Sequence, residues 1–254
     1  MSTDVLSLAT KNATLWTSDI FDEATRAEAQ ALLEKGGDDL IEPFYKDLDF
    51  GTGGMRGIMG VGTNRINPYT LGTATTGLIN YAKETYGRED LKAVIAYDSR
   101  NNSQSFARKV AEVLSANGVY TYLFEELRPT PELSFAVREL GCDFGIVLTA
   151  SHNPKEYNGY KVYWNDGGQL VPPHDGGVIA KVRQTGFEDI NWNANEDLIE
   201  TIGEAIDSKY IANVVAQSLN NDGKEDLKVV FTALHGTSIV SVPPALKASG
   251  FTNV

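Results

Sequence analysis

The sequence predicts a mixed α/β fold in which a mostly parallel sheet lies between layers of helices. Segments with helical periodicity alternate with short apolar segments along most of the 254 residues. The connections between them are short, and a strand–helix–strand–helix–strand order with short connections implies parallel pairing through right-handed crossovers. Glycine, proline or asparagine stands at most of the segment boundaries, where these residues begin or end regular structure.

Each expected helix has an apolar face or a recognisable start or stop signal. The first carries Ala27 and Ala31 on one face, and Gly36 follows it as a stop. The second begins with Asn67, a favoured N-cap, and with Pro68 in its first turn. We expect helices over residues 21–35, 68–86, 103–117, 130–140, 204–219 and 244–249.

Short apolar runs between the helices predict strands. We expect strands over residues 92–97, 119–124, 143–148, 158–164 and 227–233. The glycine-dense segment 50–57 is unsuited to a helix. Residues 166–168 are expected to form a turn, and the polar, asparagine-rich stretch 190–197 is expected to be a linker.

The strand and helices expected after residue 203 are too few to form a domain of their own. One strand and one or two helices cannot bury a core. We therefore expect residues 1–203 to form a first domain with an N-terminal helical extension. Residues 204–254 are expected to begin a second, similar α/β domain, and we interpret the chain as truncated.

Composition excludes several classes of protein. The chain has 34 acidic and 22 basic side chains, a formal net charge of −12, and such a surface would repel nucleic acid. No apolar run approaches the ~18–20 residues that cross a bilayer, and the N-terminus does not resemble a signal peptide. The single cysteine, Cys142, excludes an internal disulfide framework and a cysteine zinc site. We expect a cytoplasmic protein with no membrane or nucleic-acid partner.

The strongest candidate site is the loop 149–154, Thr-Ala-Ser-His-Asn-Pro, which follows an apolar strand. Functional loops in parallel sheets lie beyond the carboxyl ends of the strands. Ser151 would place a hydroxyl there, His152 is a possible proton carrier, and Asn153 can donate an amide hydrogen bond. The alternative is a capped turn, since these residues are common in loops. The loop is not a nucleophile elbow, because G-x-S-x-G is absent.

A second candidate is the segment 51–57, Gly-Thr-Gly-Gly-Met-Arg-Gly. Clustered glycines let backbone N–H groups approach a phosphate, and Arg56 could supply a bidentate cation. The segment matches neither the G-x-G-x-x-G fingerprint nor the P-loop. The alternative is a glycine-rich turn that permits close packing.

Further candidates are more ambiguous. In the segment 97–100, Tyr-Asp-Ser-Arg, the acid and the base could pair as a structural clamp or serve a site. Lys161 could act as a general acid or contact phosphate, although a strand lysine more often faces solvent. His235 at a strand end and His174 in a polar turn are weaker candidates. Asp47-Leu48-Asp49 has two carboxylates on one strand face, but no tight Asp-x-Asp-x-Asp cluster occurs, so we expect no complete metal site in this chain.

Together these segments resemble the α-D-phosphohexomutases, the phosphoglucomutase and phosphomannomutase superfamily. Residues 149–154 followed by 158–161 (Asn-Gly-Tyr-Lys) look like that family's phosphoserine loop, and 51–57 is similar to its N-terminal active-site loop. Residues 97–100 resemble its strand-end Asp-x-x-Arg-like element, and 234–237 (Leu-His-Gly-Thr) look like the entry to its second domain. The glycine-loop sequence resembles the branch that holds phosphoglucomutases and phosphopentomutases.

The resemblance implies a role for each matching residue. Ser151 would carry the phosphoryl group, Arg56 would neutralise the transferring phosphate, and Lys161 or His152 would handle the hydroxyl proton. Phosphate or substrate contacts would come from Thr52, Gly53, Arg100 and Asn153. A Mg²⁺ ion would bind the phosphate on Ser151 and three aspartates beyond Val254.

The resemblance also implies a phosphotransferase isomerase of four domains. It would interconvert a sugar 1-phosphate and 6-phosphate, with glucose or mannose expected first, through a sugar 1,6-bisphosphate. The partners would be a small phosphosugar and the missing C-terminal domains, and we expect this chain alone to be inactive. Two alternatives are a non-catalytic phosphosugar-binding module and a serine hydrolase that uses Ser151 and a histidine.

Overall fold

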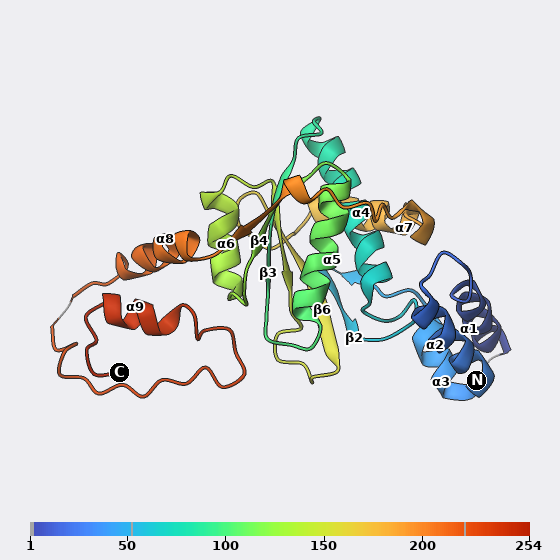
Figure 1. The fold of residues 1–254 in the computed structure, drawn as a ribbon, viewed down its shortest axis with the longest axis horizontal. Helices are drawn as coiled ribbons and strands as arrows, with labels where there is room; N and C mark the ends of the chain where they lie inside the picture. The colour runs from blue at the N-terminus through green and yellow to red at the C-terminus, as the bar shows by residue number, and fades with distance from the viewer. Residues whose placement is uncertain (1–2, 52, 221) are drawn as a thin grey trace.

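The structure is a computed structural model, and it describes residues 3–51, 53–220 and 222–254. Within these residues a sheet of seven strands forms in the order β1-β2-β6-β5-β3-β4-β7 (Figure 1). The strands are β1 (Phe50–Gly51), β2 (Gly54–Ile58), β3 (Lys92–Tyr97), β4 (Tyr120–Phe124), β5 (Phe144–Leu148), β6 (Tyr157–Trp164) and β7 (Ile199–Ile202).

The sheet is mixed. Strands β7, β4, β3 and β5 pair in parallel, whereas β6 pairs antiparallel with both β5 and β2. Because β6 runs opposite to both of its neighbours, β2 points the same way as the parallel group, and only β1 and β6 among the described strands run against it. The expected mixed, mostly parallel sheet is confirmed.

Helices cover both faces of the sheet. Ala93 and Ile95 of β3 face a large core cluster with α4 (Pro68–Tyr86), α5 (Ser103–Ala116) and α7 (His174–Gln184). Val94 and Ala96, which alternate with them, face a second cluster with α6 (Thr130–Glu139) and α8 (Glu204–Val215). Every β3 residue from Ala93 to Tyr97 is buried, as expected for a central strand with a helical layer on each side.

The predicted start and stop of α4 are confirmed. The Asn67 side chain accepts hydrogen bonds from the backbone N–H groups of Tyr69 and Thr70, which satisfies donors that a helix start leaves free. Gly87 ends the helix in the left-handed conformation, with φ of 64°, which suits a residue without a Cβ atom.

Three helices form an N-terminal unit beside this sheet: α1 (Thr3–Leu15), α2 (Glu23–Lys35) and α3 (Gly37–Phe44). Its core is aromatic, since Trp16 stacks on Phe21 with ring centroids 4.4 Å apart and also contacts Phe44. Tyr69 of α4 joins this cluster and so attaches the unit to the sheet domain. Only the α2 region was predicted as a helix. The buried residues of α1, Ala9 and Ala13, pack against residues distant in sequence such as Phe44 and Tyr69, and only the folded structure shows these contacts.

A helix occupies a segment that was expected to be a polar turn. His174, predicted to lie in a polar turn, begins α7. Gly176-Gly177 lowers the helix propensity of that segment, but a Cβ atom at Gly177 would lie 2.0 Å from the Tyr81 ring of α4. The glycine therefore permits close helix packing that overrides local propensity.

The predicted strand over 227–233 is wrong. The structure has there only an isolated bridge between Lys228 and Asn253. Leu227 and Val230 are 53% and 98% exposed, because no described strand lies beside them to form a sheet. The last helix, α9 (Val242–Ala248), lies close to its predicted position.

The domain boundary expected at residues 203–204 stays a prediction. In this structure α8 packs on the sheet domain through Ile206, and Asp207 pairs with Arg128 at 2.7 Å. Among the described residues, no helix is long and apolar enough to cross a bilayer.

Candidate active site at the carboxyl edge of the sheet

Two of the predicted site segments meet at one edge of the sheet. The strands β3 and β5 are parallel neighbours, with Tyr97 opposite Leu148, so the residues that follow them leave the sheet side by side. The Asp98 N–H donates to the Leu148 carbonyl at 3.1 Å and extends this pairing by one residue. The loop 149–154 therefore lies against the segment 98–101, as the strand-end rule predicts.

Ser151 lies at the exposed tip of this loop. Its φ of 59° is in the left-handed region, which few residues with a Cβ atom adopt. The Ser151 N–H donates to Thr149 Oγ1 at 2.9 Å, and Ser151 Oγ lies 3.3 Å from His152 Nδ1. Both side chains are exposed, so the hydroxyl and the imidazole are accessible from solvent.

Arg56 reaches the serine loop from β2. Successive strand residues face opposite sides, so Met55 is buried and Arg56 is exposed. Arg56 Nη1 donates to Asn153 Oδ1 at 2.9 Å. The close approach depends on Gly159 of β6, where a Cβ atom would lie 2.6 Å from the Thr149 carbonyl oxygen and 2.7 Å from that of Met55.

The described residues of the glycine-rich segment lie at the end of β1, at Gly53 and in β2. Gly53 has a φ of 81°, and its carbonyl accepts the N–H of Val162 at 2.9 Å. This contact fixes Gly53 against β6. Thr52, predicted to contact phosphate, lies outside the described residues.

Lys161 occupies the centre of β6, paired with Gly54 on one side and Val147 on the other. It is half-buried. Burial lowers the pKa of its ammonium group, the positive charge of Arg56 lowers it further, and Asp98 acts in the opposite direction. A lysine whose pKa is lowered towards neutrality is better suited to proton transfer.

Arg100, predicted to bind phosphate, is directed at the loop itself. Its Nη2 donates to the carbonyls of Ser151 and Asn153 at 2.7 Å each. Its Nη1 donates to those of Pro154 and Tyr157 at 2.9 and 3.2 Å. The arginine thus clamps the loop in this structure, and contact with phosphate stays a prediction.

Sequence reasoning missed the buried polar side chains behind the loop. Asn158 and Ser103 are both 0% exposed, and Asn158 Nδ2 donates to Ser103 Oγ at 2.9 Å. Ser103 Oγ in turn donates to Asp98 Oδ1 at 2.7 Å. No local sequence signal pairs these residues, because they come from different elements and meet only in the folded sheet.

The serine loop borders a cavity of about 740 Å³. Its lining includes Asp98, Ser151 and His152, and also His235 with the two residues that follow it. The Ser99 hydroxyl donates to the His235 carbonyl at 2.5 Å. His235, a weak candidate from sequence, is therefore brought to the site, whereas His174 bonds to Tyr81 at 2.9 Å and does not line this cavity.

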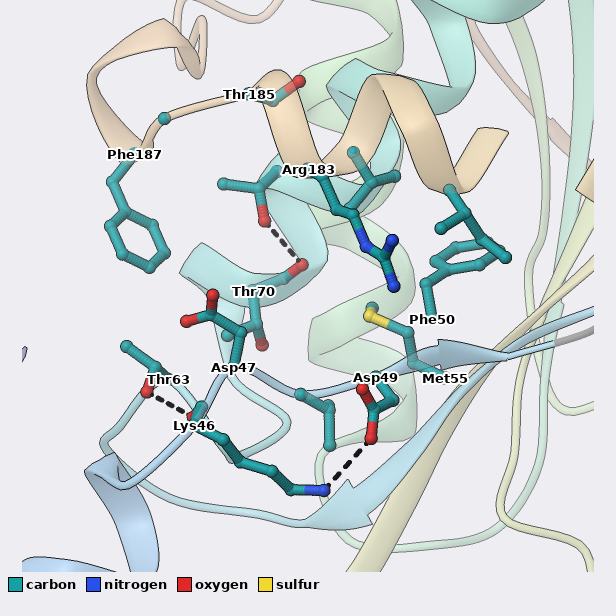
Figure 2. A pocket seen from close by; sticks show the side chains of 15 residues that line it. Lys46, Asp47, Asp49, Phe50, Met55, Thr63, Thr70, Arg183, Thr185 and Phe187 are labelled. Carbon is teal, nitrogen blue, oxygen red and sulfur yellow. Dashed lines mark hydrogen bonds and ion pairs between the residues drawn. The ribbon is translucent and has the colours of Figure 1, made fainter. Parts of the chain in front are cut away.

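A second cavity, of about 410 Å³, lies between the β1–β2 hairpin and α7 (Figure 2). Figure 2 shows Phe50, Met55 and Phe187 as its apolar wall and Lys46 paired with Asp49 at its rim, at 3.0 Å. Within the described part of the chain, none of the predicted catalytic or phosphate-binding side chains lines it. We therefore place the candidate site in the first cavity.

The cavity residues fit a magnesium site only in part. Asp98 is the one carboxylate among the described residues that line the cavity, and it already accepts from Ser103 and Thr149 and pairs with Arg100. The described residues contain no group of three or more His, Cys, Asp or Glu side chains that could hold a metal ion. A phosphate on Ser151 could offer oxygen ligands, but the carboxylates of the described residues do not complete the coordination.

The arrangement suits transfer of a phosphoryl group. The accessible Ser151 hydroxyl has an imidazole beside it, and the Arg56 guanidinium reaches the same loop through Asn153. Lys161 lies close enough to Arg56 and Asp98 for their charges to act on it, but neither Arg56 nor Lys161 lines the cavity. Such transfer depends mainly on positioning and on stabilising charge. The geometry does not favour a serine hydrolase, because no carboxylate among the described residues bonds to His152 to orient it as a general base.

Comparisons with known proteins identify the family of this chain. Residues 47–189 match the family model described as "Phosphoglucomutase/phosphomannomutase, alpha/beta/alpha domain I". The chain is 40% identical over 216 residues to a phosphoglucomutase of Staphylococcus haemolyticus, covering 83% of this chain and 39% of that protein. It is 37% identical over 250 residues to a phosphoglucomutase of Staphylococcus aureus, covering 96% and 44%.

A solved structure shares the fold. The crystal structure of a putative phosphomannomutase from Thermus thermophilus superposes with a TM-score of 0.68 at 24% identity, covering 82% of this chain and 45% of that one. The chain thus spans about two-fifths of the length of the curated relatives it matches. The resemblance noted from the sequence motifs is confirmed.

Proposed function

The chain belongs to the phosphoglucomutase/phosphomannomutase family, and on that premise we propose that it provides the phosphoryl-carrying serine of a phosphosugar mutase. The reaction would interconvert a sugar 1-phosphate and 6-phosphate, with a glucose or mannose phosphate as the substrate. The observation that carries the proposal is the exposed Ser151 hydroxyl at the carboxyl edge of the sheet, with Arg56 reaching the same loop.

The proposed step exchanges one phosphoryl group between two oxygens. From a sugar 1,6-bisphosphate, Ser151 Oγ forms a new bond to phosphorus as the bond from phosphorus to the sugar oxygen breaks. The serine proton ends on the sugar oxygen. In the reverse step an incoming sugar monophosphate attacks the phosphoserine through its free hydroxyl: the bond from phosphorus to Ser151 Oγ breaks, the hydroxyl proton returns to Ser151, and a bisphosphate forms. No free phosphate is released.

The neighbouring side chains have separate roles in this proposal. Arg56 would stabilise the negative charge of the transferring group, and the Asn153 amide and the turn at Gly53 would help to hold it. Lys161, whose pKa is lowered by burial and by Arg56, or His152, 3.3 Å from the serine oxygen, would move the proton. Thr52 stays in the proposal as a loop donor.

We propose Mg²⁺ as the cofactor, as the family resemblance implies, with Ser151 contributing through its phosphate. The ion would supply charge neutralisation at the phosphoryl group. Its carboxylate ligands are sought outside this sequence, in further domains of the protein. A cytoplasmic location, proposed from composition, accords with the one free and buried cysteine, Cys142.

The protein expressed from its complete gene tests this function. After incubation with glucose 1,6-bisphosphate and Mg²⁺, its intact mass should increase by one phosphoryl group, and peptide mapping should place that group on Ser151. Ser151→Ala should abolish both labelling and mutase turnover. Ser105→Ala is the matched control, because the Ser105 hydroxyl donates only to the Asn102 carbonyl, away from the site.

The alternative of a non-catalytic phosphosugar-binding module makes a different prediction. Such a module would bind the sugar phosphate, but it would neither accept a phosphoryl group nor turn over substrate when expressed from the complete gene. The 254-residue chain on its own is expected to show negligible turnover, and robust turnover by it would contradict the proposed need for further domains.

A further inference from the structure

The backbone of Ser151 is connected to a shielded carboxylate through one side chain. The Ser151 N–H donates to Thr149 Oγ1 at 2.9 Å, and the Thr149 hydroxyl donates to Asp98 Oδ2 at 2.6 Å. Thr149 is 7% exposed and the Asp98 side chain 14%, so water competes little for these bonds. The left-handed φ of 59° at Ser151 persists only where the surroundings determine it.

The carboxylate is itself held from the opposite side. Asp98 Oδ1 accepts a hydrogen bond from the Ser103 hydroxyl at 2.7 Å and one from the backbone N–H of Arg100 at 3.0 Å. Asn158, fully buried, donates to Ser103 and fixes the direction of that hydroxyl. Since an ionised carboxylate only accepts hydrogen bonds, it can serve all these donors at once, and a neutral amide cannot.

The same carboxylate also anchors the other side of Ser151. Asp98 Oδ2 pairs with Arg100 Nε at 3.2 Å, and Arg100 Nη2 donates to the Ser151 carbonyl at 2.7 Å. The N–H and the carbonyl of Ser151 are thus each one side chain away from Asp98. Rotation of this residue out of the left-handed conformation would break both connections.

Taking the proposed function as the starting point, we propose that Asp98 is the positioning residue of the phosphoryl-carrying serine. It acts through Thr149 on the Ser151 N–H and through Arg100 on the Ser151 carbonyl. Asp98 also lines the cavity, but the role proposed for it lies in these two bonds and not in a contact with the substrate. Its effect is to present the serine hydroxyl to the cavity in one orientation, before substrate arrives.

Thr149→Val removes the link without changing the size of the side chain, and the protein expressed from its complete gene is used throughout. Thr149→Ser keeps the hydroxyl and is the conservative rescue. Thr121→Val is the matched control, since Thr121 is a fully buried threonine of the same sheet whose hydroxyl donates only to the Val119 carbonyl. If Thr149→Val does not fold, Asp98→Asn takes its place.

Two readouts are compared: deuterium uptake at the Ser151 amide, and the rate of phosphoryl transfer from glucose 1,6-bisphosphate to Ser151. In Thr149→Val we expect faster deuterium uptake and a rate constant lower by about tenfold or more, because a misplaced reacting group loses its near-attack geometry. The bisphosphate concentration that gives half the maximal rate should not change, since the role proposed for the Thr149 hydroxyl is to hold Ser151 and not to contact the substrate. Thr149→Ser and Thr121→Val should behave as wild type in both readouts.

Wild-type uptake and transfer rate in Thr149→Val would overturn the proposal. So would an equal loss in Thr121→Val, which would mean that any buried hydroxyl of the sheet matters. If the wild-type protein accepts no phosphoryl group, the proposed function fails. The deuterium comparison then still decides whether Asp98 and Thr149 hold the Ser151 backbone.

Discussion

Helices α4 and α7 touch at a glycine, and this contact gives a quantitative prediction. A Cβ atom at Gly77 would lie 2.7 Å from the backbone N and Cα of Val182. Ordinary van der Waals contact begins at 3.4 Å, so in Gly77→Ala α7 must move away by 3.4 − 2.7, about 0.7 Å. Backbone atoms cannot rotate aside as a flexible side chain would, and the whole helix has to shift.

The size of the effect follows from two opposing contributions. Replacing glycine by alanine inside a helix gains about 1 kcal/mol, whereas overpacking a filled core costs about 1–3 kcal/mol. Because the clash is with main-chain atoms, we take the upper part of that range and expect a net loss of about 1–2 kcal/mol in the free energy of unfolding. For a domain of this size, that lowers Tm by roughly 2–8 °C.

A urea titration followed by tryptophan fluorescence measures this loss. Gly176→Ala is the control, because Gly176 lies in α7, is exposed, and would place its Cβ atom more than 4 Å from any neighbour. It should stabilise the protein by about 0.5–1 kcal/mol. A Gly77→Ala protein as stable as wild type, or an equal destabilisation by Gly176→Ala, would refute the packing argument.

Three other predictions concern buried polar groups. Burial and the nearby Asp207 raise the pKa of Glu132 to about 8, whereas the pKa of a glutamate in an unfolded chain is about 4.3. Because the native state holds the extra proton, the free energy of unfolding should fall as the pH rises from about 4.3 to about 8. Urea titrations across that interval measure this fall, which should be absent in Glu132→Gln. Arg100→Lys keeps the positive charge but cannot donate to four carbonyls. We expect the free energy of unfolding to fall by about 2 kcal/mol and the backbone amides of residues 150–157 to take up deuterium faster. Unchanged deuterium uptake in this loop would argue against the clamp. Burial raises the pKa of the Cys142 thiol to about 12, so a thiol reagent should label it only in denaturant, and rapid labelling of the native protein would contradict the buried position.

The fold was predictable where local signals and tertiary packing agree. The alternating strands and helices from β3 to β5 were predictable, because each strand is an apolar run and each helix has an apolar face and a residue that ends it. The short strand β7 was missed because Ile199–Ile202 is exposed at its two central positions and gains its structure from pairing with β4. The strand expected over 227–233 shows the converse, since an apolar run without a neighbouring strand has no sheet to join.

The site was predictable at the level of its motifs. Ser151, Arg56 and Lys161 were selected as residue types suited to phosphoryl chemistry. Parallel pairing of β3 and β5 accounts for the position of the serine loop, whereas Arg56 and Lys161 lie on β2 and on the antiparallel strand β6. The direction of the Arg100 side chain was not predictable, because a strand-end arginine can face a ligand or its own chain. The bonds from Asn158 to Ser103 also needed the folded structure, since these residues are 55 positions apart.

The hydrogen bonds of the serine loop join residues that are far apart in sequence, so the candidate site can form only late in folding. Arg56 and Asn153 are 97 residues apart in sequence, and Asp98 and Thr149 are 51 apart. Closing such long loops costs chain entropy, which is recovered only when β2, β3, β5 and β6 have paired. A partly folded chain would therefore present Ser151 on a flexible segment without its arginine. Phosphoryl acceptance at this serine should thus serve as a sensitive report that the whole sheet has formed.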